Sequence, residues 1–197
     1  LMNVVLKKRG LPKISIADYQ ETFCFPLEDY YKQLGFDFKK EPYLVASLEF
    51  IQLYNKEKYR AQLYPGIINL IESLQKQSVQ NYLLSAQNHD SLLQLVEFYK
   101  IGALFERVQG TDNLHARGKE ELAYSLLKSL NIHHNEVLFI GDTNMDVNIA
   151  LKNNSQILAL TFGHQSKQRF LKSNKLTLID SVKDLSAYLS QKFLGNQ

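Results

Sequence analysis

The sequence predicts an α/β fold in which a parallel sheet, covered by helices on both faces, follows a small helical region. Up to Tyr64-Pro65 the apolar residues recur only at helical spacing. After Pro65, short apolar runs alternate with helical segments, which is the pattern of a parallel sheet joined by helical crossovers. The runs are apolar throughout, as expected for strands buried on both faces.

The helical region contains no strand pattern. Its elements are the end of a helix over 1–9, a helix that begins at 15, a short helix over 26–34 and a longer one over 42–60. Gly10 ends the first helix. Ser15, followed by Asp18, has the pattern of a helix N-cap with an acidic residue in the first turn. We therefore expect a small helical bundle.

The second region reads as alternating elements. In order, we predict a helix over 67–74, a strand over 82–84, a helix to 98 capped by Asn88 or Asp90, a strand over 105–109, a helix over 119–130, a strand over 137–140, a helix over 145–152, strands over 157–161 and 176–179, and a final helix to 193 capped by Ser181. Ligands of such sheets bind beyond the carboxyl ends of the strands.

The bulk properties exclude several classes of function. A net charge of +3, with Lys and Arg interleaved among Asp and Glu, is too small a bias for a nucleic-acid or anionic-membrane partner. No apolar stretch approaches the length of a membrane span. The single cysteine, Cys24, lies between two phenylalanines and reads as a packed thiol in a reducing compartment. We expect a cytoplasmic protein.

Four side chains carry the candidate chemistry. Ser85 and Asp142 each follow a predicted strand, so both should project from the same edge of the sheet. Asp142 and Asp146, four residues apart at a helix start, can face one hard cation. Lys119 begins another helix. A hydroxyl and an ammonium that hold phosphate, beside carboxylates that hold Mg²⁺, form the set that phosphoryl transfer uses.

Each of these residues also has a purely structural interpretation. Ser85 is of a residue type common in turns and caps, and a lone lysine such as Lys119 is usually solvated. Asp142 and Asp146 are typical N-terminal helix residues. Only the combination, at one edge of one sheet, favours a site. Of the histidines, His115 and His164 lie in loops that could face it, but no spacing indicates a transition-metal centre.

Three stretches resemble motifs of the haloacid dehalogenase superfamily, phosphoglycolate phosphatase-like group. They are Asn81-Tyr-Leu-Leu-Ser85, Arg117-Gly-Lys119-Glu and Val137-Leu-Phe-Ile-Gly-Asp-Thr-Asn-Met-Asp146. The resemblance covers essentially the whole chain and implies a helical cap over 1–64 and a Rossmann-like core over 65–197. It also implies a Mg²⁺-dependent phosphatase that acts on a small phosphorylated metabolite.

The resemblance assigns roles by position. Ser85, helped by the backbone amide of Ala86, would bind a phosphoryl oxygen. Lys119 would neutralise the phosphate and a covalent aspartyl-phosphate. Asp142 would be a Mg²⁺ ligand, and Asp146 would bind the metal or orient its shell and assist catalysis.

The sequence departs from the family at the first motif. The family's Asp-x-Asp, on the central first strand, has no equivalent here, because the chain begins inside the first cap helix. Asp18 and Asp29 lie in cap-like helices and are poor substitutes. We expect the nucleophile to lie upstream and this chain alone to be inactive. The alternatives are an inactive binding or regulatory module, a phosphomutase or a dehalogenase. An unfilled place in the sheet would also favour strand exchange in a homodimer.

Overall fold

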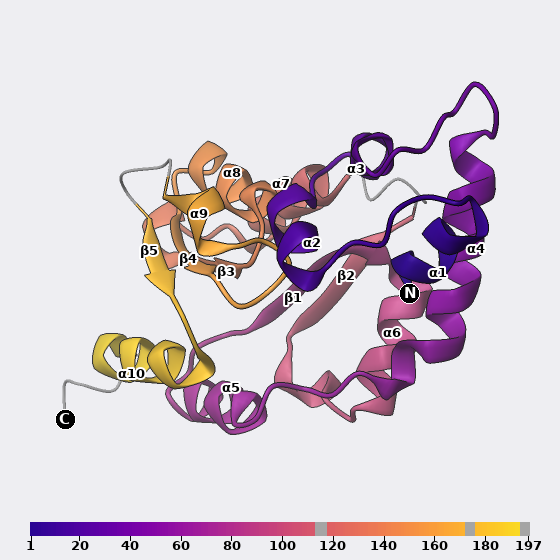
Figure 1. Cartoon of the computed structure of the whole chain (residues 1–197). Helices are drawn as coiled ribbons and strands as arrows, with labels where there is room; N and C mark the ends of the chain where they lie inside the picture. The colour runs from indigo at the N-terminus through magenta and orange to yellow at the C-terminus, as the bar shows by residue number, and fades with distance from the viewer. Residues whose placement is uncertain (113–117, 172–175, 194–197) are drawn as a thin grey trace.

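A computed structural model describes residues 1–112, 118–171 and 176–193, and it confirms the α/β fold (Figure 1). The helical segment, residues 1–60, consists of α1 (Met2–Lys8), α2 (Ile16–Thr22), α3 (Leu27–Gln33), α4 (Tyr43–Glu57) and a 3-10 turn, η1 (Lys58–Arg60). It buries a core of its own, in which Tyr30, Tyr31 and Phe36 pack against Leu6 of α1 and Ala46 of α4. As predicted, this segment contains no strand among its described residues.

The predicted cap at Ser15 is confirmed in full. The Ser15 hydroxyl accepts a hydrogen bond from the Asp18 amide, and the Asp18 carboxylate accepts one from the Ser15 amide, both at 3.0 Å. This reciprocal capping box satisfies backbone donors that the start of a helix leaves unpaired. Two residues three positions apart, Ser15 and Asp18, were therefore enough to predict where α2 begins.

The rest of the chain alternates strands and helices. In order, its elements are α5 (Ile67–Lys76), β1 (Tyr82–Asn88), α6 (His89–Phe98), η2 (Gly102–Leu104), β2 (Arg107–Thr111), α7 (Lys119–Leu130), η3 (His134–Glu136), β3 (Leu138–Gly141), α8 (Asn144–Lys152), β4 (Gln156–Leu160), α9 (Lys167–Phe170), β5 (Thr177–Ile179) and α10 (Val182–Phe193). No helix in the described ranges is long and apolar enough to cross a membrane.

The strands form two parallel sheets rather than one. β1 pairs with β2, and β4 lies between β3 and β5. Successive residues of β4 face opposite layers: Leu158 packs with α5 and α10, whereas Ile157 and Ala159 pack with α8 and Phe170. The three-stranded sheet is therefore covered on both faces, as its apolar sequence predicted.

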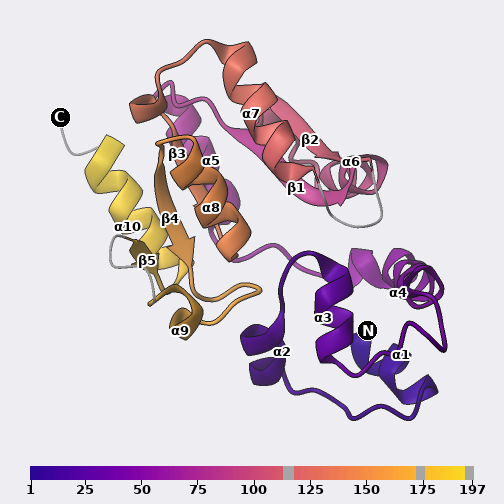
Figure 2. The ribbon, with the colours of Figure 1, turned by 90° about the horizontal axis from the view of Figure 1, so that it is seen from above.

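The two sheets lie side by side without pairing (Figure 2). Among the described residues, β1 pairs only with β2 and β3 only with β4, so each sheet has an open edge at one of these two strands. These two strands are also less buried than β4. Ile140 of β3 is 43% exposed, whereas Leu158 and Ala159 of β4 are 1% and 0% exposed. The absence of a strand beside the open edges of β1 and β3 within the described residues leaves their backbone groups without a strand partner there.

One boundary prediction was wrong in a way that matters for the site. The strand predicted to end before Ser85 continues to Asn88, with an irregularity in its pairing to β2 between Leu84 and Asn88. Ser85 therefore lies within β1 and not directly after it. The polar residues Ser85, Gln87 and Asn88 hid this extension, because a polar run after an apolar one is typical of a turn.

Candidate functional site

Asp142 lies at the carboxyl end of β3, where the sequence predicted it. Its Oδ2 accepts a hydrogen bond from the backbone N–H of His164 at 2.7 Å, so the carboxylate lies against the loop that follows β4. A Cβ on Gly163 would lie 2.1 Å from the same oxygen. Residue 163 must therefore be glycine for the carboxylate to occupy this position.

Asp146 is 6% exposed and both of its carboxylate oxygens have partners. Oδ2 accepts hydrogen bonds from the amide and the hydroxyl of Thr143, at 3.1 and 2.7 Å, and so completes the capping box at the start of α8. Oδ1 accepts a hydrogen bond from Lys119 Nζ at 2.5 Å. Gly141 makes this possible, because a Cβ there would lie 2.3 Å from the Asp146 Cβ. Asp146 thus caps α8, as its structural interpretation predicted, and also contacts Lys119, another charged residue of the candidate site.

Lys119 begins α7, as predicted, after Gly118 in the left-handed region at φ 96°. Its side chain is 16% exposed and its ammonium reaches across to α8 rather than into solvent. The solvated interpretation of a lone lysine does not hold here. The structure therefore brings Lys119, Asp142 and Asp146 to one place, the start of α8.

Ser85 lies on the other sheet. Its Oγ accepts a hydrogen bond from the Gln87 amide at 3.1 Å, and the carbonyl of Ala86 accepts one from Thr111 Oγ1 at 2.9 Å. No hydrogen bond joins Ser85 or Ala86 to Lys119, Asp142 or Asp146 in the part of the chain that the structure describes. The two halves of the predicted site thus lie on different sheets, Ser85 within β1 and Asp142 directly after β3.

The residues present have the chemistry of a magnesium site but do not complete one. Carboxylate oxygen is the ligand that Mg²⁺ prefers, and Asp142 offers it at a strand end. Asp146 is engaged by Lys119 and Thr143. Within the described ranges, no group of three or more His, Cys, Asp or Glu residues could hold a metal ion. A magnesium ion held by Asp142 would therefore need further oxygen ligands.

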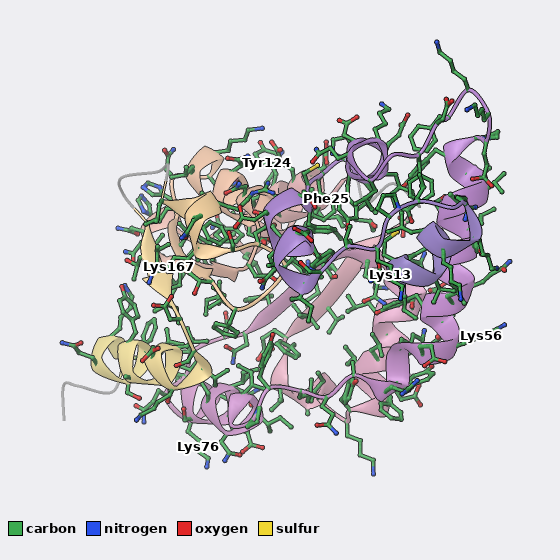
Figure 3. All side chains as sticks on the ribbon, in the orientation of Figure 1. Lys13, Phe25, Lys56, Lys76, Tyr124 and Lys167 are labelled. Atoms are coloured by element: carbon green, nitrogen blue, oxygen red, sulfur yellow. The ribbon has the colours of Figure 1, made fainter. Side chains whose placement is uncertain are left out.

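A cavity of about 530 Å³ borders Lys119 on the side of the helical segment. The start of α7, one face of α8 and the linker between α2 and α3 line it; Phe25 of that linker is labelled in Figure 3. Neither Ser85 nor Asp142 is among its lining residues. The cavity gives access to Lys119 but does not include all the residues of the predicted site.

Sequence reasoning undervalued His164 and missed Gln165 and Gly163. His164 stacks on Phe23 of the helical segment, with ring centroids 4.9 Å apart, and hydrogen-bonds Tyr19. Gln165 is 2% exposed and bonds to both α8 and the helical segment. The only sequence signal for this loop was its place after a strand. His115 and Arg117, also considered above, lie outside the described residues.

The model of the haloacid dehalogenase-like hydrolase family matches residues 1–160. The chain belongs to that family. Phosphoglycolate phosphatase 1 of Pseudomonas aeruginosa is 24% identical to it over 137 residues, 69% of this chain and 50% of that protein. A phosphoglycolate phosphatase of Pseudomonas savastanoi pv. phaseolicola is 23% identical over the same lengths. The chain spans about half the length of these curated relatives.

Solved structures show the same fold. A predicted phosphatase from Clostridium acetobutylicum superposes with a TM-score of 0.76 at 21% identity, over 96% of this chain and 88% of that chain. Protein tyrosine kinase A from Mycobacterium tuberculosis superposes with a TM-score of 0.77 at 17% identity, over 95% and 88%. Because these proteins carry different names on one fold, the fold alone does not decide the activity.

Proposed function

We propose that this chain belongs to a phosphatase that hydrolyses a small phosphate monoester through an aspartyl-phosphate. The observation that carries the proposal is the cluster of Lys119, Asp142 and Asp146 at the start of α8, beside an open edge of β3. The largely buried ammonium of Lys119 suits the negative charge of a phosphoryl group. The carboxylate of Asp142, at a strand end, suits the cation that would accompany that group.

The same proposal places the nucleophilic aspartate upstream of Leu1, on a strand between β1 and β3. Two features support this placement. Both strands have an edge without a strand partner in the described ranges, and Ile140 beside that edge is 43% exposed. A parallel strand would satisfy both rows of backbone groups and cover the apolar side chains. It would also bring its carboxyl end between Ser85 and Asp142.

In the proposed reaction, one oxygen of the upstream aspartate bonds to phosphorus as the ester P–O bond breaks, and the leaving alcohol takes a proton from a general acid on the same strand. Water then gives a proton to the deprotonated acid and attacks phosphorus, and the bond between phosphorus and the aspartate oxygen breaks, which regenerates the carboxylate and releases inorganic phosphate. Ser85 and the Ala86 amide would hold one phosphoryl oxygen. Lys119 would neutralise another. Mg²⁺, when bound at Asp142, would offset the remaining negative charge.

The experiment compares variants of the full product of the gene, assayed with Mg²⁺ and p-nitrophenyl phosphate. Lys119→Met and Asp142→Asn should each reduce kcat/KM by about 100-fold or more. Lys167→Met is the matched control. Lys167 also forms a Lys–Asp ion pair, with Asp180 at 2.7 Å, but that pair lies on the exposed surface. Equal activity in all three variants would refute the assignment. A full product that binds phosphate without turnover would favour the inactive binding module.

A further inference from the structure

The loop after β4 contacts the helical segment on one side and the candidate site on the other. The carbonyl of Gly163 accepts a hydrogen bond from Gln20 Nε2 at 3.0 Å, and the Ser166 amide donates one to the carbonyl of Gln20 at 3.3 Å. Between them, the His164 amide bonds to Asp142. Helix α2 and the carboxylate of Asp142 are therefore held by the same few residues.

Within the described part of the chain, Gln165 is the one side chain of this loop that hydrogen-bonds to both the helical segment and α8. Its Oε1 accepts the backbone N–H of Asn144 at 2.7 Å, and its Nε2 donates to the carbonyl of Phe23 at 2.8 Å. Asn144 is the first residue of α8, and Phe23 is the C-cap of α2. Both backbone groups stand at helix ends, where an intrahelical partner is lacking. One buried amide therefore caps two helices from the two parts of the molecule.

We propose that Gln165 is a positioning residue that couples the seating of α2 on the core to the turn that carries Asp142 and Asp146. An amide suits this role, because it offers one acceptor and two donors on a single planar group. If α2 moves away, the Phe23 carbonyl leaves Nε2, and a buried amide with one unsatisfied end is costly. The inference extends the proposed function, and its structural part can be tested without any turnover.

A carboxylate at position 165 can make one of the two hydrogen bonds of Gln165 and not the other, so it tests them separately. Gln165→Glu keeps an acceptor for the Asn144 amide at the positive end of α8, but it cannot donate to the Phe23 carbonyl. Gln165→Met removes both bonds at similar volume. Gln75→Glu is the control: Gln75 Nε2 also donates to a backbone carbonyl, that of Ala103, but far from α2 and α8.

The readout is amide hydrogen exchange followed by NMR on the 197-residue chain. Gln165→Glu should speed exchange in α2 by about tenfold, the effect of losing one hydrogen bond, and leave the first turn of α8 unchanged. Gln165→Met should speed both. The control should change neither. Equal exchange in α2 for wild type and Gln165→Glu would overturn the inference.

A double-mutant cycle tests the coupling itself and serves if Gln165→Glu fails to fold. Gln20→Leu removes a contact that α2 makes with the loop but leaves α8 untouched. With Gln165 present, it should speed exchange of the Asn144 amide; with Gln165→Met, it should add nothing there. Additive effects would refute the coupling. In the full gene product, Gln165→Glu should raise KM more than it lowers kcat, whereas an inert product would refute only the proposed phosphatase.

Discussion

Lys119 Nζ lies 2.5 Å from Asp146 Oδ1, so the first residue of α7 is tied to the first turn of α8 by an ion pair that is largely shielded from water. The same aspartate caps α8 through Thr143. One carboxylate thus fixes the helix start and the ammonium together. Neither partner can be removed without leaving the other charge poorly solvated.

Removing the Asp146 carboxylate should therefore be costly. Asp146→Ala loses the cap and leaves Lys119 unpaired, which we expect to lower the free energy of unfolding by about 2–4 kcal/mol. Asp146→Asn can still accept from Thr143 and should cost less. Asp180→Asn breaks an exposed Lys–Asp pair that water screens, so it should lower the free energy of unfolding far less. Urea denaturation measures all three. A similar loss for Asp146→Ala and Asp180→Asn would contradict this account.

Gly163 should tolerate no side chain. Gly163→Ala places a Cβ 2.1 Å from Asp142 Oδ2, so the carboxylate or the loop must shift. We expect a loss of about 1–3 kcal/mol in unfolding free energy. Gly102→Ala is the matched control, because its Cβ would meet its nearest neighbour at 3.6 Å, and it should stay within about 0.5 kcal/mol of wild type. Thermal melts of the two variants should differ clearly.

The helical segment should lose stability in acid through Glu49. Lys8, and then Arg9, hydrogen-bond its carboxylate and hold the pKa of Glu49 below its ordinary value of 4.5. A carboxyl whose folded pKa is lowered stabilises the protein above the ordinary pKa, and this contribution disappears as pH falls through the folded value.

Arg9→Met removes much of that stabilisation. At pH 7 we expect it to lower the free energy of unfolding by about 1–3 kcal/mol, since Arg9 bonds both Glu41 and Glu49. The difference between wild type and variant should shrink as pH falls below the ordinary pKa of 4.5 and through the lowered pKa of Glu49. Urea midpoints across this range check it; a difference that does not change with pH would exclude Glu49 as the titrating group.

Much of the fold was readable from local sequence. The caps at Ser15, Asn88 and Ser181 have their sequence pattern and their hydrogen bonds in the structure. The position of Asp142 after an apolar strand was equally clear. These features depend on residues a few positions apart, for which spacing and side-chain chemistry suffice.

The remainder depends on contacts between distant parts of the chain. Gln165 bonds to Phe23, 142 residues away, and nothing in its sequence neighbourhood indicates a partner. Asp146 could be identified as a cap or as a ligand, but its pairing with Lys119 depends on how the fold brings the start of α7 to the start of α8. The end of β1 was misplaced because polar residues within a parallel strand resemble a turn, and only the pairing with β2 decides between them.

The most direct test of the proposed function compares the 197-residue chain with the full product of its gene, each verified by intact mass and assayed with Mg²⁺ and p-nitrophenyl phosphate. Only the full product should hydrolyse the ester, because we propose that the nucleophilic aspartate lies on a further strand between β1 and β3. Hydrolysis at an equal rate by the 197-residue chain would contradict the account. So would an inert full product that retains Lys119 and Asp142.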